Sequence, residues 1–253
     1  MEQKNNKKVK IILIVLVLIV AISLISIGLI SYFNSKVTGK NDLGLGSETP
    51  IGNVNQEVIE AVQEGRNLQN ELKNINATYT DAACWLKIPG TNVDTPVFKS
   101  KDNDRYLRHD RDNKKTKWGE TFLDFRSDVN NMDNMSHFII YGHNTETNDH
   151  FTPILNYKKK DFFKNHQIIE MSTLKGNYKW QVFTVYVTDS DFFYIDTKFA
   201  DKTEYGEFLK TLKSKSLYDT NINISGDDTL LTLSTCDYSL KNGRFVVQAK
   251  LVK

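Results

Sequence analysis

The pattern of apolar and polar positions changes sharply along this chain, and its first feature is a long apolar run. Residues 11–35 contain no charged side chain and are mostly Ile, Leu and Val. As a helix, about twenty such residues would span about 30 Å, the thickness of the hydrocarbon core of a bilayer. The run therefore predicts a transmembrane segment over residues 11–33.

The residues that precede this run suggest its orientation. Residues 1–10 carry four lysines and one glutamate, and basic residues stay on the cytoplasmic side of a membrane. We predict a cytoplasmic tail over residues 1–10 and a single-pass protein of the cell membrane with its C-terminal domain outside. A cleaved signal peptide also begins with basic residues, but its apolar segment is usually only about 7–15 residues long. The greater length favours an uncleaved signal-anchor.

Downstream of the run, the pattern indicates a linker and then one folded domain. Residues 34–54 are rich in Gly, Ser and Asn without apolar periodicity, which is typical of a flexible linker. Residues 55–253 are assigned to the folded domain. Its first element is predicted to be an amphipathic helix over residues 55–77, because apolar residues recur there at close to helical spacing: Val58, Val62, Leu68, Leu72 and Ile75.

Short runs with β-type composition then follow one another, broken by Gly, Asn and Asp. They cover residues 85–88, 93–98, 121–125, 137–141, 168–171, 178–188, 229–234 and 244–252. Eight short strands in about 170 residues predict a mainly β fold, an eight-stranded closed or nearly closed barrel. One helix interrupts them at about residues 201–215, where Asp201 and Glu204 resemble a capping pair and apolar residues line one face: Tyr205, Phe208, Leu209 and Leu212.

Composition narrows the function classes. The chain of 253 residues has a formal net charge of +2, 40% hydrophobic and 25% charged residues, and two cysteines. These values exclude a disordered chain, a disulfide-stapled miniprotein and a many-pass membrane protein. The small net charge also argues against binding to nucleic acid. Cys84 and Cys236 could pair in an oxidising compartment, but each also fits a small buried hydrophobic residue.

The last two predicted strands bring a cysteine and an arginine together. Period-two alternation places Leu231 and Leu233 on the core face and Cys236 on the opposite face. Arg244 likewise points away from the core, and only seven residues, with the turn signal Asn242-Gly243, separate it from Cys236. In an antiparallel hairpin the two become neighbours, and a nearby cation favours the nucleophilic thiolate. The same pattern also fits a core thiol and a solvated arginine.

A cysteine nucleophile needs a partner that moves protons. The candidates are His109, His137, His143, His150 and His166. His109 and His166 lie in charged stretches that suggest solvated side chains, His137 begins an apolar strand and is interpreted as structural, and His150 follows a polar loop. His143 ranks first because it follows an apolar strand directly, at the point where the chain turns into a polar loop.

No metal or cofactor is indicated. Asp102-Asn103-Asp104 and Asp110-Arg111-Asp112 lack the glycine and the distal glutamate of a calcium loop. The sequence contains no CxxC, HExxH, GxGxxG or phosphate-loop motif.

Several segments, taken together and in order, resemble the class B sortases. These are Trp85-Leu86-Lys87-Ile88-Pro89-Gly90-Thr91, Thr95-Pro96-Val97, Asp102-Asn103 with Tyr106-Leu107, Phe122-Leu123-Asp124-Phe125-Arg126, Tyr141-Gly142-His143-Asn144, Thr232-Leu233-Ser234-Thr235-Cys236 and Arg244-Phe245-Val246-Val247. The helix at about 201–215 resembles the extra helix of that class. Cys84 departs from the family, which often has a small residue such as Gly before the tryptophan, and is interpreted as structural.

The resemblance implies a cysteine transpeptidase of a Gram-positive bacterium that joins secreted proteins to the cell wall. Cys236 would attack a threonine carbonyl in a C-terminal sorting motif and form a thioacyl enzyme. An amine of a peptidoglycan precursor or of a pilin lysine would then resolve it. His143 would transfer protons, and Arg244 would stabilise the oxyanion. The resemblance places substrate-binding residues at Asn103, Leu107, Ser190, Tyr194, Ile195 and Ser234, and implies no cofactor.

Two alternatives are compatible with the residues. A cysteine protease or amidase would hydrolyse its acyl-enzyme with water, although the order of His143 before Cys236 is opposite to the papain-like arrangement. A surface binding module would carry out no chemistry.

Overall fold

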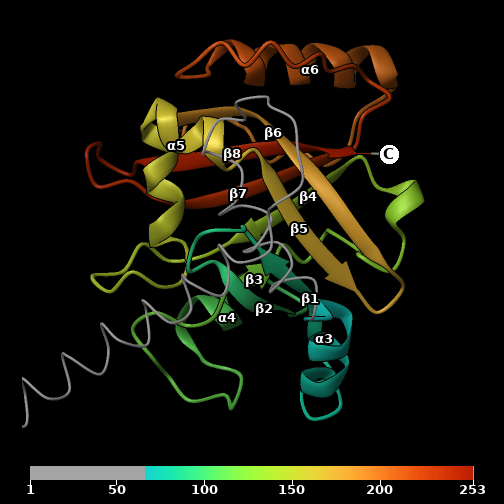
Figure 1. The fold of residues 1–253 in the computed structure, drawn as a ribbon, viewed down its shortest axis with the longest axis vertical. Coiled ribbons are helices and arrows are strands. Elements are labelled where there is room, and N and C mark those ends of the chain that lie inside the picture. The colour runs from blue at the N-terminus through green and yellow to red at the C-terminus, as the bar shows by residue number, and fades with distance from the viewer. Residues whose placement is uncertain (1–65, 253) are drawn as a thin grey trace, which may run out of the picture. The chain divides into compact units, whose positions relative to one another are not determined.

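The computed structural model describes residues 66–252, which form a closed barrel of eight strands (Figure 1). Around the barrel the strands follow the order β1-β2-β3-β4-β7-β8-β6-β5, and β5 pairs with β1 to close it. Most neighbouring pairs are antiparallel, but β2 with β3 and β4 with β7 are parallel. The mainly β, eight-stranded architecture predicted from the sequence is confirmed.

The strands are β1 (Ala82–Lys87), β2 (Asp94–Lys99), β3 (Phe122–Leu123), β4 (His137–Tyr141), β5 (Ile168–Thr173), β6 (Asn177–Thr188), β7 (Leu230–Cys236) and β8 (Arg244–Val252). The helices are α3 (Leu68–Asn76), α4 (Arg105–Arg108), α5 (Lys160–Asn165) and α6 (Lys202–Ser214), with two 3₁₀ segments, η1 (Met132–Asn134) and η2 (Thr152–Lys158).

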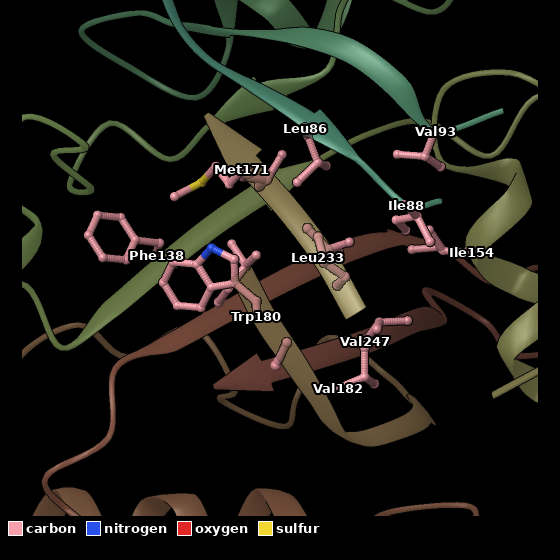
Figure 2. Close-up of a cluster of buried hydrophobic side chains, with 14 of the residues drawn as sticks. Leu86, Ile88, Val93, Phe138, Ile154, Met171, Trp180, Val182, Leu233 and Val247 are labelled. Carbon is pink, nitrogen blue, oxygen red and sulfur yellow. The ribbon is translucent and has the colours of Figure 1, made fainter. Parts of the chain in front are cut away.

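Side chains from every part of the barrel fill its interior. Figure 2 shows this cluster, in which Leu86 of β1, Trp180 of β6 and Leu233 of β7 are inaccessible to solvent. The ring of Phe138 packs edge-on against the indole of Trp180 at a centroid distance of 5.9 Å. Burial of such large apolar side chains is the main favourable contribution to folding, and it fixes the ends of the strands relative to one another.

A second apolar cluster lies on the outer side of β6, β7 and β8, beneath α6 (Figure 1). In β6, an irregularity between Val182 and Thr184 shifts the alternation by one residue, so that Val182 faces the interior while Phe183 and Tyr186 face α6. Tyr205, Leu209 and Leu212 of α6 are buried on this cluster. As predicted, Asp201 caps α6, because its Oδ1 accepts from the backbone N–H groups of Thr203 and Glu204 at 2.7 and 2.9 Å.

The N-terminal helix is shorter in the described structure than the prediction. Of the predicted helix 55–77, residues 55–65 lie outside the described residues, and α3 covers Leu68–Asn76. Leu68 and Leu72 are buried against Trp85 and Phe98 of the barrel, as the amphipathic pattern predicts. The predicted strands match closely, and the bounds of β4 and β8 agree with the prediction. The prediction omitted α4, η1, η2 and α5, which are too short to produce a helical periodicity.

The predicted membrane localisation requires a correction. Within residues 66–252, no helix is long and apolar enough to cross a membrane. The longest, α6, has 13 residues, or about 20 Å at the α-helical rise, and it is amphipathic with a charged outer face. The predicted tail 1–10, segment 11–33 and linker 34–54 lie outside the described residues. We therefore withdraw the localisation.

Candidate active site

The hairpin of β7 and β8 places Cys236 directly opposite Arg244. The two strands pair antiparallel from Leu230 with Lys250 to Cys236 with Arg244. The backbone N–H of Asp237 closes the hairpin by donating to the carbonyl of Gly243 at 3.0 Å. A side chain at position 243 would collide with the facing backbone, because a Cβ there would lie only 2.3 Å from the carbonyl oxygen of Asp237. The neighbourhood of cysteine and arginine predicted from the alternation is confirmed.

Cys236 is the last residue of β7 and lies where this buried strand reaches the protein surface. Leu231 and Leu233 face the barrel interior, and the opposite face of the strand is covered by the cluster under α6, so all residues from 230 to 235 are buried. Cys236 alone in this strand is partly exposed. Cys236 is therefore partly accessible to solvent, while its backbone is held by its pairing with Arg244 on one side and by the side-chain amide of Asn144 on the other.

The guanidinium of Arg244 is fixed by the turn that precedes it. Its Nη1 donates to the carbonyls of Asn242 and Gly243 at 3.2 and 2.9 Å. Asn242 adopts a positive φ of 55°, which asparagine tolerates better than most residues. Within residues 66–252 the guanidinium makes no other hydrogen bond, so its remaining N–H groups are available to a ligand.

The parallel pairing of β4 with β7 brings His143 to the same end of the barrel. Tyr141 pairs with Ser234, and the N–H of Gly142 donates to the carbonyl of Ser234 at 3.2 Å. His143 follows Tyr141 by two residues, as Cys236 follows Ser234. The side-chain amide of Asn144 joins the two segments by donating to the carbonyl of Cys236 at 3.1 Å.

The surroundings of the His143 ring determine which nitrogen carries the proton and whether the ring is charged. Nε2 lies 2.9 Å from the carbonyl oxygen of Leu107, and because a carbonyl only accepts, Nε2 carries the proton and Nδ1 is left as an acceptor. Burial lowers the pKa of His143 below its usual value, against the opposing effect of the Leu107 carbonyl, and the charges of Arg108 and His150 lower it further. The ring is therefore neutral near pH 7 and can take up a proton at Nδ1.

The predicted substrate-binding residues fall into three groups. Leu107 contacts His143 through its carbonyl. The Tyr194 hydroxyl lies 2.8 Å from Oγ of Ser234, with both side chains buried behind the hairpin. Burial raises the pKa of Tyr194, an effect that Cys236 reinforces and that the bond to Ser234 and the charge of Arg244 oppose, which indicates that this phenol lies near both hairpin residues.

Within residues 66–252, the other three predicted binding residues form no hydrogen bond with His143, Cys236 or Arg244. Asn103 is bonded to the carboxylate of Asp124. Ser190 is an exposed residue of the turn after β6, and Ile195 packs into the cluster under α6. A role for these residues in substrate binding stays a prediction.

Two other histidines and the second cysteine are packed against neighbouring groups, which indicates structural roles. His137 is fully buried between the carbonyl of Asp196 and the hydroxyl of Thr232, at 2.6 and 2.7 Å, as its structural interpretation predicts. His166 was expected to be solvated, but its ring stacks on Phe162 at a centroid distance of 3.8 Å. Cys84 is inaccessible, and burial raises the pKa of its thiol to about 12, which leaves it unreactive.

Sequence reasoning missed four side chains that shape the site. Trp118 packs edge-on against the His143 ring at 5.7 Å, and Asn144 binds the backbone of Cys236. Asp237 is buried next to the cysteine, with an oxygen 2.5 Å from Nζ of Lys158 in η2. Asn144 belongs to a recognised motif and Asp237 directly follows one. Their partners are distant in sequence, so the motifs alone did not indicate these contacts.

The carboxylates do not form a metal centre within residues 66–252, which contain no group of three or more His, Cys, Asp or Glu side chains able to hold an ion. Asp102 instead accepts from the backbone N–H groups of Asp104 and Arg105.

Comparison with known proteins agrees with this geometry. Residues 86–252 match the family model described as the sortase domain. The chain belongs to the sortase family. It is 37% identical to sortase B of Listeria monocytogenes over 187 residues, which cover 73% of this chain and 75% of the relative. It is 34% identical to sortase B of Staphylococcus aureus over 185 residues, which cover 72% and 75% of the two chains.

Solved structures show the same similarity. The Staphylococcus aureus sortase B–substrate complex superposes with a TM-score of 0.68 at 33% identity, over 78% of this chain and 91% of that chain. The resemblance to class B sortases is therefore confirmed. Sortases are cysteine transpeptidases, so the chain is an enzyme, and the alternative of a binding module without chemistry is wrong.

Proposed function

We propose that this sortase cleaves a C-terminal sorting motif after threonine and transfers the acyl group to an amine of a cell-wall precursor or of a pilin. The observation that carries the proposal is the pairing of β7 with β8 on one side and β4 on the other, which gathers Cys236, Arg244 and His143 at one end of the barrel. The similar sortase B of Staphylococcus aureus was solved as a substrate complex, which supports a substrate-binding role for this chain.

In the first step, Sγ of Cys236 bonds to the threonine carbonyl carbon while its proton passes to His143. Nδ1 is the ring nitrogen with an open lone pair, since Nε2 is bound to Leu107. The carbonyl oxygen becomes an oxyanion, and the free N–H groups of Arg244 are the donors that stabilise it. The C–N bond then breaks, and His143 returns the proton to the leaving amine.

In the second step, the acceptor amine attacks the thioester carbonyl and gives a proton to His143. Collapse of this intermediate breaks the C–S bond, and the proton moves to the leaving sulfur. A neutral histidine suits both steps, because each requires one proton to be taken up and then released. Burial, with Trp118 packed against the ring, keeps His143 neutral against the opposing effect of the Leu107 carbonyl.

The proposal is tested with a library of fluorogenic peptides that all contain threonine at the cleavage position. Peptides that are cleaved are then incubated with triglycine, or with an α-acetylated lysine amide as a mimic of a pilin acceptor, and the products are analysed by mass spectrometry. We expect ligated product to replace the free acid as the amine concentration rises. Exclusive formation of the free acid at every amine concentration would instead assign the enzyme as a hydrolase.

A further inference from the structure

A buried carboxylate, Asp124, connects three segments of the chain, one of which is β4, the strand that leads to His143. It follows β3 and is inaccessible to solvent. Its two oxygens accept from Nε and Nη2 of Arg126 at 2.8 Å each, from the backbone N–H of Arg126 at 2.9 Å, from Nδ2 of Asn103 at 3.0 Å and from the hydroxyl of Tyr141 at 2.9 Å. These hydrogen bonds outweigh the effect of burial and lower the pKa of Asp124 to about 2. Asp124 is therefore ionised at neutral pH and can only accept hydrogen bonds.

The contacts of Asn103 determine the orientation of its amide. The backbone N–H of Phe125 donates to its oxygen at 3.0 Å, and its nitrogen donates to Asp124. An N–H cannot accept and a carboxylate cannot donate, so the amide has only one orientation that satisfies both neighbours. Its second N–H has no acceptor among the described residues, and the side chain is partly exposed. Asn103 therefore presents a hydrogen-bond donor to any ligand beside it.

Tyr141 extends the same network toward the catalytic histidine. It is the last residue of β4, two positions before His143, and its ring packs on Phe122 of β3 at a centroid distance of 5.2 Å. Because its hydroxyl proton is directed to Asp124, the phenol oxygen has lone pairs but no proton for another partner. Asp124 thus leaves Asn103 as a hydrogen-bond donor, and Tyr141 as a hydrogen-bond acceptor, toward any further partner.

We propose that Asp124 is a positioning residue that fixes Asn103 as a hydrogen-bond donor, so that the sorting peptide must present an oxygen to Asn103. This inference rests on the proposed function and on the predicted contact of Asn103 with the substrate, and it deepens them by assigning the polarity of that contact. The oxygen belongs to a peptide carbonyl or to an amide or hydroxyl side chain, and a peptide N–H at this point is rejected. A site with buried, oriented polar groups discriminates strongly, because a mismatched ligand leaves them unpaired.

Asp124→Asn tests the orientation. An asparagine at 124 has one accepting oxygen, which the cation of Arg126 retains, and its NH₂ group then faces the NH₂ group of Asn103. If Asn103 rotates to relieve this contact, its NH₂ group meets the N–H of Phe125. The amide of Asn103 therefore loses its fixed orientation. We expect KM for the peptide that the wild-type enzyme cleaves fastest to rise about tenfold, the loss of one hydrogen bond, with kcat changed by less than about twofold.

A double-mutant cycle separates positioning from a merely structural role. In the Asn103→Ala background, which has no amide to orient, Asp124→Asn should raise KM no further. The matched control is Asp133→Asn, which makes the same change at an exposed carboxylate in η1 that forms no side-chain hydrogen bond or ion pair within residues 66–252 and should leave KM and kcat unchanged. Equal, additive effects of Asp124→Asn in the two backgrounds would overturn the proposal, as would a fall in kcat alone.

Asn103→Asp provides a second test that retains the carboxylate of Asp124, in case Asp124→Asn does not fold. The aspartate can still accept from Phe125, but it replaces both N–H groups of the amide, the free one and the one bound to Asp124, by an accepting oxygen, and we expect KM to rise at least about tenfold. A KM equal to that of the wild type would overturn the inference. If the wild-type enzyme cleaves no threonine peptide, the proposed function itself fails, which distinguishes the two results.

Discussion

Replacement of Gly142 by alanine should destabilise the protein and displace His143, the proposed catalytic histidine. Gly142 lies between Tyr141 and His143, and a Cβ at this position would be 2.5, 2.8 and 2.9 Å from three ring carbons of Phe151. Carbon atoms in contact are separated by about 3.5–4.0 Å, so the ring must move by about 1 Å. Phe151 is completely buried in the barrel cluster and cannot swing into solvent.

The loss of stability expected for Gly142→Ala follows from the tight packing of the Phe151 ring. Inserting a methyl group into a packed core costs about 1–3 kcal/mol, which for a domain of this size lowers Tm by about 2–12 °C. The backbone N–H of Phe151 donates to the carbonyl of His143 at 3.0 Å, so a shift of Phe151 also moves the histidine. We expect kcat/KM to fall together with Tm.

Urea unfolding and peptide cleavage measure the two effects. Gly176→Ala is the matched control, because the nearest atom to its Cβ would be the Tyr178 hydroxyl at 3.6 Å, an ordinary contact. Phe151→Leu should remove the collision, so Gly142→Ala should cost at least about 1 kcal/mol less in that background. Equal stability losses for the two glycine variants, or additivity with Phe151→Leu, would refute the proposed packing.

Three further predictions concern charged and titratable groups. Arg244→Lys should lower kcat/KM by at least about a hundredfold with unchanged Tm, because an ammonium cannot bind the turn carbonyls and direct planar N–H groups at an oxyanion; near-normal turnover would remove Arg244 from the catalytic set. Burial lowers the pKa of His137 to about 4, so the unfolded chain binds the extra proton first and stability should fall by about 3 kcal/mol as the pH drops from 7 to 4. His137→Gln should lose this component in urea titrations, and an unchanged pH dependence would contradict the assignment. Lys158→Met should cost about 1–3 kcal/mol by leaving the buried Asp237 carboxylate without its cation, whereas a loss no larger than that of the exposed neighbour, Lys159→Met, would show that the ion pair is unimportant.

Local sequence patterns predicted the barrel because its strands are short, apolar and separated by turn residues. The same alternation predicted that Cys236 and Arg244 share a face, since only a seven-residue connection separates them. His143 could be ranked from its place after a strand, but its approach to Cys236 depends on the parallel pairing of β4 with β7, which are separated by almost ninety residues.

Polar contacts between distant segments could not be predicted in this way. Asp124, Asn103 and Tyr141 lie within recognised segments, but no period or spacing indicates that one carboxylate binds the other two side chains. The cover of α6 over the outer face of β7 was also missed, although α6 itself was predicted. Alternation shows that two faces differ, but it does not show which other element covers the second face.

The most direct test of the account is to trap the acyl-enzyme. Wild-type enzyme is incubated with a cleavable threonine peptide in the absence of an amine acceptor, and the intact protein is analysed by mass spectrometry. We predict an adduct with the mass of the N-terminal peptide fragment, mapped to Cys236, present in Cys84→Ala and absent from Cys236→Ala. Peptide cleavage by Cys236→Ala, or an adduct on any other residue, would contradict the assignment of Cys236 as the nucleophile.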